Sequence, residues 1–126
     1  MIILDTSCLI RFFTKDDLKK AEAIFNLLED DSQDLLVPDV VLPELEYVLS
    51  SDFYQASRKE ICDAFLFLRS LKNIIFNSPE TCVAIDFFCS CKLDMADCLV
   101  AAYSLKHDIA SFDKSLLKVV GKSSVL

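Results

Sequence analysis

The chain has 126 residues, of which 53% are hydrophobic and 26% charged, which excludes a disordered protein and suffices for the core of one domain. Its net charge of −7 argues against tight, non-specific binding of nucleic acid, because contacts with phosphates need local positive charge. No apolar run approaches the roughly 20 residues that cross a bilayer, and residues 2–5 read as a strand and not as a secretory signal, so we expect a cytoplasmic protein without membrane contact.

Four short apolar runs are predicted to be strands, at residues 2–4, 35–37, 74–76 and 108–112, and residues 119–120 or 125–126 could add an edge strand. Helical spacing of apolar residues predicts helices after Asp5, over 18–29, 40–49, 56–71 and 79–91, and from residue 93 onward, with a short helical turn at 116–117. Thr6 or Ser7 is expected to cap the first helix and Asp39 the third.

The alternation of short strands with helices predicts an α/β fold with a parallel sheet, right-handed crossovers and helices on both faces. The single glycine and three prolines also favour helices with short connections over a sandwich or barrel of many tight turns. No repeat, low-complexity segment or linker divides the chain, so we expect one domain over residues 1–126.

The cysteines carry no metal-site pattern. Six are present, in apolar stretches, and His107 is the only histidine. Cys89 and Cys91 form a C-x-C pair, but no second pair of cysteines stands at zinc-site spacing. We therefore interpret all six cysteines as reduced core residues in a reducing compartment.

Four acids are predicted to lie at one edge of the sheet, because strand carboxyl ends and helix amino ends gather there. Asp5 and Asp113 each close an apolar run, Glu44 lies early in the helix after the second strand, and Asp97 lies in the first turn of the helix before the fourth. Carboxylates that lie this close repel one another, and a hard divalent cation, Mg²⁺ or Mn²⁺, is the usual solution. Thr6, Ser7 and Ser111 are small hydroxyls suited to supporting such ligands.

Structural alternatives remain open for these acids. Asp5 can end a strand in a turn, and Asp113 can end a strand or cap the turn after it. Asp94 and Asp97 stand three residues apart in one helical turn, so either can cap the helix or favour its dipole.

Glu44 has a rival in Glu46 for the inward-facing position. Leu42, Leu45 and Leu49 occupy one stripe of the predicted helix, and Glu44 borders that stripe near the helix start. We therefore prefer Glu44.

Four motifs carry a family resemblance. Asp5-Thr6-Ser7 after an apolar strand resembles the opening motif of PIN-domain ribonucleases, especially the VapC-type toxins of prokaryotic toxin–antitoxin pairs. Pro43-Glu44-Leu45 resembles their second acidic motif, residues 93–102 the third, and Ser111-Phe112-Asp113-Lys114 the fourth. The motifs occur in order over nearly the whole chain.

The resemblance implies a PIN-like three-layer α/β/α sandwich, with a short parallel central sheet of four or five strands, and a metal-dependent endoribonuclease that hydrolyses RNA phosphodiesters with Mg²⁺ or Mn²⁺. Asp5, Glu44 and Asp97 match the family's central acids and Asp113 the more variable fourth, whereas Asp94 matches an acid that is less often a ligand. Thr6, Ser7, Asp94 and Ser111 are then expected to support the ligands.

The resemblance also implies partners: an RNA substrate, a cognate antitoxin and a second copy of the chain in a homodimer. Core packing explains most of the apolar residues that leave room for an interface equally well; they are Leu9, Ile10, Phe12, Phe13, Phe25, Phe53 and Tyr54. Basic residues near the expected site, which are candidates for RNA phosphates or simply solvated charges, are Arg11, Lys15, Lys92 and Lys114.

The sequence fits two other families, which are not nucleases, poorly. A haloacid-dehalogenase phosphatase needs a second aspartate where this chain has Ser7, and a receiver domain needs an acidic pair that the start of the chain lacks. The remaining alternative is a non-catalytic PIN-like module that binds protein or RNA, which the net acidity favours and the presence of all four acids disfavours.

Overall fold

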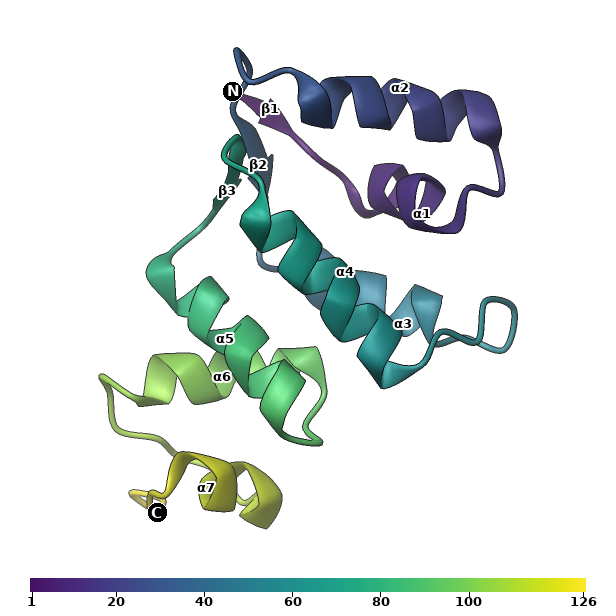
Figure 1. Ribbon diagram of the computed structural model, residues 1–126. Coiled ribbons are helices and arrows are strands. Elements are labelled where there is room, and N and C mark those ends of the chain that lie inside the picture. Colours follow the sequence, from purple (N-terminus) through teal and green to yellow (C-terminus); the bar gives the residue numbers. More distant parts are fainter. The chain divides into compact units, whose positions relative to one another are not determined.

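The computed structural model describes all 126 residues, which form two compact units, residues 1–77 and 78–126 (Figure 1). The first unit contains β1 (Ile2–Ile3), α1 (Thr6–Thr14), α2 (Leu18–Glu29), β2 (Leu35–Val37), α3 (Val41–Leu49), α4 (Arg58–Ser70) and β3 (Ile74–Phe76). The second contains α5 (Pro79–Ser90), α6 (Met95–Ser104) and α7 (Lys114–Val120). The expected alternation of strands and helices is confirmed in the first unit, and the second unit is helical.

The three strands form one parallel sheet in the order β1-β2-β3. Ile2 pairs with Leu35, and Leu35 pairs in turn with Ile74. Leu35 and Val37 of the central strand are fully buried, as expected for a strand with neighbours on both sides. β1 is an edge strand, and its residue Ile3 is 66% exposed. Parallel pairing and the α/β class are confirmed.

The expected fourth strand at residues 108–112 is absent, and residues 119–120 belong to α7, so the sheet has three strands and not four or five. The segment before α7 makes isolated bonds to the chain's last residues: Val125 N donates to Ile109 O at 2.9 Å and Ser111 N to Ser124 Oγ at 3.1 Å. Ile109 is buried but Phe112 is 90% exposed, so only one large apolar side chain of this run needs a core. Burial of that one residue does not require a strand ladder.

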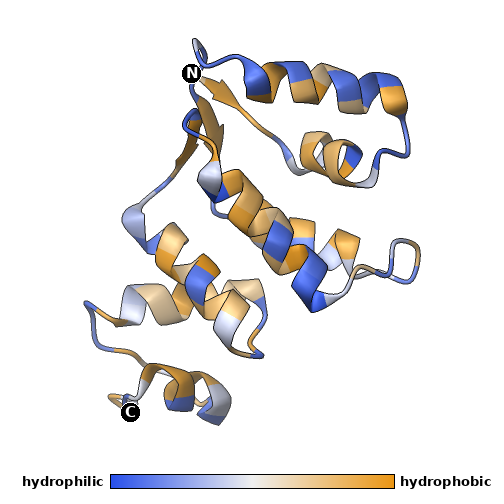
Figure 2. Cartoon of the chain, in the orientation of Figure 1, coloured by the Kyte–Doolittle hydropathy of each residue, from blue (hydrophilic) through white to orange (hydrophobic).

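Helix boundaries follow the predicted ones closely because most helices carry amphipathic faces and side-chain caps. Hydrophobic and hydrophilic residues alternate along α2 and α4 (Figure 2). Ser57 and Glu60 form a capping box at the start of α4, with Glu60 N donating to Ser57 Oγ at 3.1 Å and Ser57 N donating to Glu60 Oε1 at 3.0 Å.

Two predicted caps are wrong. Asp5, not Thr6 or Ser7, is the N-cap of α1. It immediately precedes the first helical residue, so its carboxylate can accept a hydrogen bond from Ser7 N, one of the backbone N–H groups without a partner inside the helix. Val40 occupies the N-cap position of α3, while Asp39 N donates to Asn77 Oδ1 at 2.6 Å.

The core of each unit is apolar. In the first unit α1 packs against α2 and α3, and in the second α6 packs against α5 and α7. Fully buried apolar side chains of the first unit include Leu4, Leu9, Leu35, Val37, Leu42, Leu45, Phe65 and Leu68, and those of the second include Ile85, Phe88, Met95 and Cys98.

The cysteines only partly match the sequence interpretation. Cys8, Cys82, Cys91 and Cys98 are free, whereas Cys62 and Cys89 are not free thiols, so the expectation of six reduced cysteines is wrong at these two positions. No helix of the chain is long and apolar enough to serve as a membrane span.

Candidate metal-binding acids

Leu4 and Asp5 connect β1 to α1. Leu4 is buried, and the side chain of Asp5 caps α1. Asp5 Oδ2 accepts hydrogen bonds from the Ser7 hydroxyl at 2.8 Å and from Ser7 N at 3.4 Å. These bonds lower the pKa of Asp5, the hydroxyl of Ser7 having the largest effect. The carboxylate is therefore ionised at neutral pH.

Thr6 joins the first acidic motif to the second. Its side chain is buried at the first residue of α1, and its hydroxyl donates to Glu44 Oε2 at 2.8 Å. Glu44 lies in the first turn of α3. The bond supports the choice of Glu44 over Glu46, because it holds the Glu44 carboxylate beside the start of α1 where Asp5 lies.

Asp94 and Asp97 lie together at the start of α6. Asp94 is the N-cap and its Oδ1 accepts from Asp97 N at 2.9 Å. Partial burial raises the pKa of Asp97, and the charges of Asp94 and Asp113 add to the rise. Negative charge is therefore concentrated around Asp97.

Asp113 approaches this group from the start of α7. Its Oδ1 accepts from Leu116 N at 3.0 Å as the N-cap of that helix, and its own N donates to Ser111 Oγ at 3.0 Å. Ser111 thus fixes the backbone of Asp113 within the fourth motif.

The predicted acids are thus brought together in two separate groups, Asp5 with Glu44 in the first unit and Asp94, Asp97 and Asp113 in the second. Within either unit, no group of three or more His, Cys, Asp or Glu side chains is placed to hold a metal ion. The meeting of all four predicted ligands therefore stays a prediction. The donor set fits Mg²⁺ or Mn²⁺, because every donor is a carboxylate oxygen and no histidine or thiolate is among them.

The candidate phosphate-binding cations have different surroundings. Arg11 Nη1 pairs with Asp16 Oδ2 at 2.7 Å, and Lys15 Nζ lies 5.2 Å from the centre of the Phe12 ring. Lys92 and Lys114 are exposed. Lys92 and Lys114 are therefore freer than Arg11 and Lys15 to contact phosphate.

Lys20 is a further cation near Ser7 that the motifs did not identify. It lines a cavity of about 320 Å³ together with Ser7, Cys8 and Arg11. Because Lys20 lies on α2, only the packing of α1 against α2 brings it there, and no spacing along the sequence signals it.

The model of one protein family matches nearly the whole chain: residues 2–122 match the PIN domain. Searches of curated proteins and of solved structures found no match. The four acidic motifs, the parallel sheet and this match agree, and the chain belongs to the PIN domain family.

Proposed function

We propose that this protein is a metal-dependent endoribonuclease that hydrolyses RNA phosphodiester bonds. PIN domains are typically nucleases and generally use divalent metal ions. The observation that carries the proposal is the bond from Thr6 to Glu44, because it draws two acidic motifs, separated by 38 residues, to the start of one helix.

Asp5, Glu44, Asp97 and Asp113 are the proposed ligands of Mg²⁺ or Mn²⁺. When bound, such an ion polarises the phosphodiester and lowers the pKa of a coordinated water. Thr6 holds Glu44, Ser7 bonds Asp5, and Asp94 and Ser111 fix the backbone beside the other two acids. Partial burial and the charges of Asp94 and Asp113 raise the pKa of Asp97, and this supports a cation here, because a positive ion would stabilise the ionised carboxylate.

The domain organisation is also part of the proposal. Residues 1–126 are proposed to act as one PIN domain in which helices cover both faces of the sheet. Arg11, Lys15, Lys92 and Lys114 are the proposed contacts for RNA phosphates, to which Lys20 is added from its place beside Ser7.

A role as the toxin of a type II toxin–antitoxin pair in the cytoplasm, as a homodimer and with a cognate antitoxin, is proposed from the resemblance to VapC-type proteins. The structure narrows the residues available for partners. Leu9 and Ile10 are buried, whereas Phe25 is 49% and Phe53 83% exposed. Phe25 and Phe53 are therefore the proposed contacts with another chain.

The test is cleavage of a structured RNA by purified protein with Mn²⁺, comparing wild type with Asp5→Asn and with Asp31→Asn. Asparagine caps a helix as well as aspartate, so Asp5→Asn removes the charge and keeps the cap. Asp31 is an exposed loop residue and gives the same change of net charge elsewhere. We expect cleavage by wild type and Asp31→Asn, stopped by a chelator, and at least a hundredfold loss in Asp5→Asn.

Two results would contradict the proposal. Equal cleavage by Asp5→Asn and wild type would show that the nuclease is a contaminant. Absence of cleavage with every RNA and metal tested, together with saturable RNA binding, would favour the non-catalytic module.

A further inference from the structure

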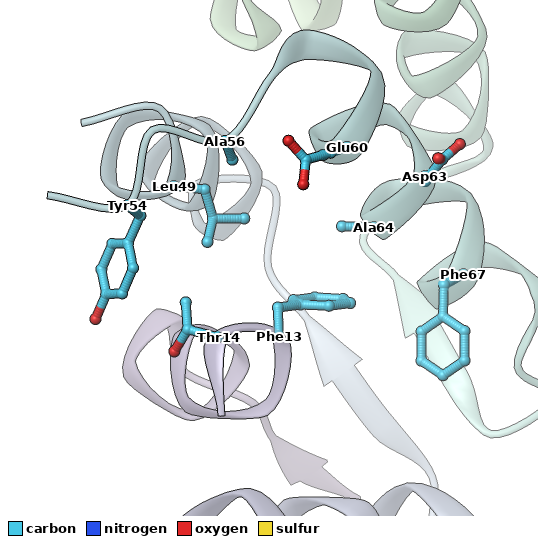
Figure 3. Close-up of a pocket in the computed structure, with 9 residues that line it drawn as sticks. All are labelled: Phe13, Thr14, Leu49, Tyr54, Ala56, Glu60, Asp63, Ala64 and Phe67. Carbon is cyan, nitrogen blue, oxygen red and sulfur yellow. The ribbon is translucent and has the colours of Figure 1, made fainter. Parts of the chain in front are cut away.

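A cavity of about 540 Å³ lies in the first unit, apart from the candidate acids (Figure 3). Its wall comes from the ends of α1 and α3, from the connection between α3 and α4, and from α4. The volume falls within the range of sites that hold small organic molecules.

The lining combines an apolar wall with negative charge. Rings and short aliphatic side chains form most of it, and Glu60 and Asp63 are its only charged residues. Figure 3 shows the Glu60 carboxylate pointing toward Leu49, Ala56 and Phe13, whereas Asp63 points away. Asp63 is also paired with Lys59 at 3.2 Å, so Glu60 is the acid that faces the cavity.

The carboxyl ends of two helices add to the negative charge at the cavity. Phe13 and Thr14 are the last residues of α1, and Leu49 is the last residue of α3, so both helices direct their negative carboxyl ends to the cavity wall. The positive amino end of α4 is also near, but Glu60 lies in its first turn and offsets it. No lysine or arginine lines the cavity, so a positively charged ligand is favoured.

The wall is held in place before any ligand binds. Phe12 stacks on Phe67 with ring centres 5.6 Å apart, and Phe13 meets Phe67 edge-on at 6.2 Å. The Tyr54 hydroxyl donates to Asp16 at 2.7 Å, and the same carboxylate oxygen pairs with Arg11. Ligand binding therefore does not have to order these rings.

Glu60 is equally fixed. Its Oε1 accepts from Ser57 N at 3.0 Å in the capping box, and these bonds lower its pKa, so the carboxylate is ionised at neutral pH. An aromatic wall beside a fixed carboxylate is the arrangement that binds ammonium and guanidinium groups by cation–π and ionic contacts.

We propose that this cavity is a binding site for a small organic cation, an amine or guanidinium carried on an apolar body. The apolar body would pack against Phe13, Leu49 and Ala64, and the cation would meet Glu60. The proposal is independent of nuclease activity, because the cavity contains none of the candidate acids or supporting hydroxyls.

The experiment titrates the full chain with tryptamine and follows the amide signals by NMR. Indole-3-propionate is the matched probe, with the same ring and the opposite charge. Glu60→Gln removes the charge and keeps the capping box, which accepts glutamine at this position. Glu29→Gln is the control, because Glu29 is an exposed glutamate at the end of α2 that does not line the cavity.

We expect saturable shifts at the cavity residues with tryptamine, about fivefold weaker binding in Glu60→Gln, as for a solvent-exposed ion pair, and no change in Glu29→Gln. Indole-3-propionate should not saturate. Ala64→Leu should fill the cavity and abolish binding; if that variant does not fold, Glu60→Gln still decides.

Three results would overturn the proposal. Equal affinity for both probes would show an apolar hollow without a preference for charge. An equal loss in Glu29→Gln would show a general effect of net charge. Binding of a blocked arginyl-tryptophan peptide without binding of tryptamine would assign the cavity to a protein partner.

Discussion

Thr6 offers the sharpest test of how the fold positions the proposed site. Thr6→Val replaces a buried hydroxyl by a methyl group of similar size and leaves Glu44 Oε2 without its donor at 2.8 Å. A hydrogen bond to a charged acceptor contributes about 1.5–3 kcal/mol, but Glu44 is exposed and water can replace the lost donor. We therefore expect a loss of about 1 kcal/mol in the free energy of unfolding.

This loss converts to a small change in melting temperature. The unfolding entropy of about 2.1 cal/mol/K per residue gives a shift of about 4 °C for a chain of 126 residues. At 25 °C the variant should therefore remain folded, and changes in activity can be attributed to the position of Glu44.

The assay is the rate of Mn²⁺-dependent RNA cleavage by wild type, Thr6→Val and Thr6→Ser. Without its donor the Glu44 carboxylate rotates among several orientations, and we expect a loss of about tenfold in rate, as for a misplaced supporting group of a metal ligand. Serine keeps the hydroxyl and should restore at least half of the wild-type rate. Full activity in Thr6→Val, or an equal loss in Thr6→Ser, would refute the positioning role of Thr6.

Three further predictions concern stability and are measured by thermal melting. Mn²⁺ at about ten times its dissociation constant should stabilise the wild type by about 1.4 kcal/mol and have less effect on Asp5→Asn; equal shifts would place the ion elsewhere. Burial and neighbouring charges raise the pKa of Asp97 in the folded state, so its ionised form costs stability at neutral pH, and that cost disappears as the pH falls below the ordinary aspartate pKa. Asp97→Asn should therefore have a higher melting temperature than wild type at pH 7 and the same melting temperature near pH 3. A higher melting temperature that persists at pH 3 would contradict the electrostatic explanation. Ser57→Ala should lower the unfolding free energy by about 1 kcal/mol through loss of the α4 cap, while Ser57→Asp should not; equal melting of both variants would show that the capping box contributes little.

The helices could be predicted from the sequence because their apolar faces and caps are local. The range predicted for α2, residues 18–29, is the range observed, and α4 begins two residues later than predicted because Ser57 caps it. The three strands were predicted because each is a short run of large apolar residues followed by a polar or turn-forming residue.

The fourth strand was not predictable in the same way. An apolar run shows that a segment has side chains to bury, but strand pairing depends on backbone partners elsewhere in the chain. At Ile109 the partner is Val125, through one bond, and that contact has no signature in the spacing of residues. Lys20 was missed for the same reason, since its position beside Ser7 depends on helix packing.

The candidate site shows why capping and metal binding do not exclude each other. Asp5, Asp94 and Asp113 are all N-caps, and capping is the structural alternative that the sequence left open for Asp94 and Asp113. An ionised carboxylate has about four acceptor positions, and each of these caps uses one oxygen for its helix, so an oxygen remains for a cation. The amino end of a helix also favours the ionised form that metal binding needs. An acid selected as a ligand can therefore cap a helix as well, and only asparagine, which keeps the cap and removes the charge, separates the two roles.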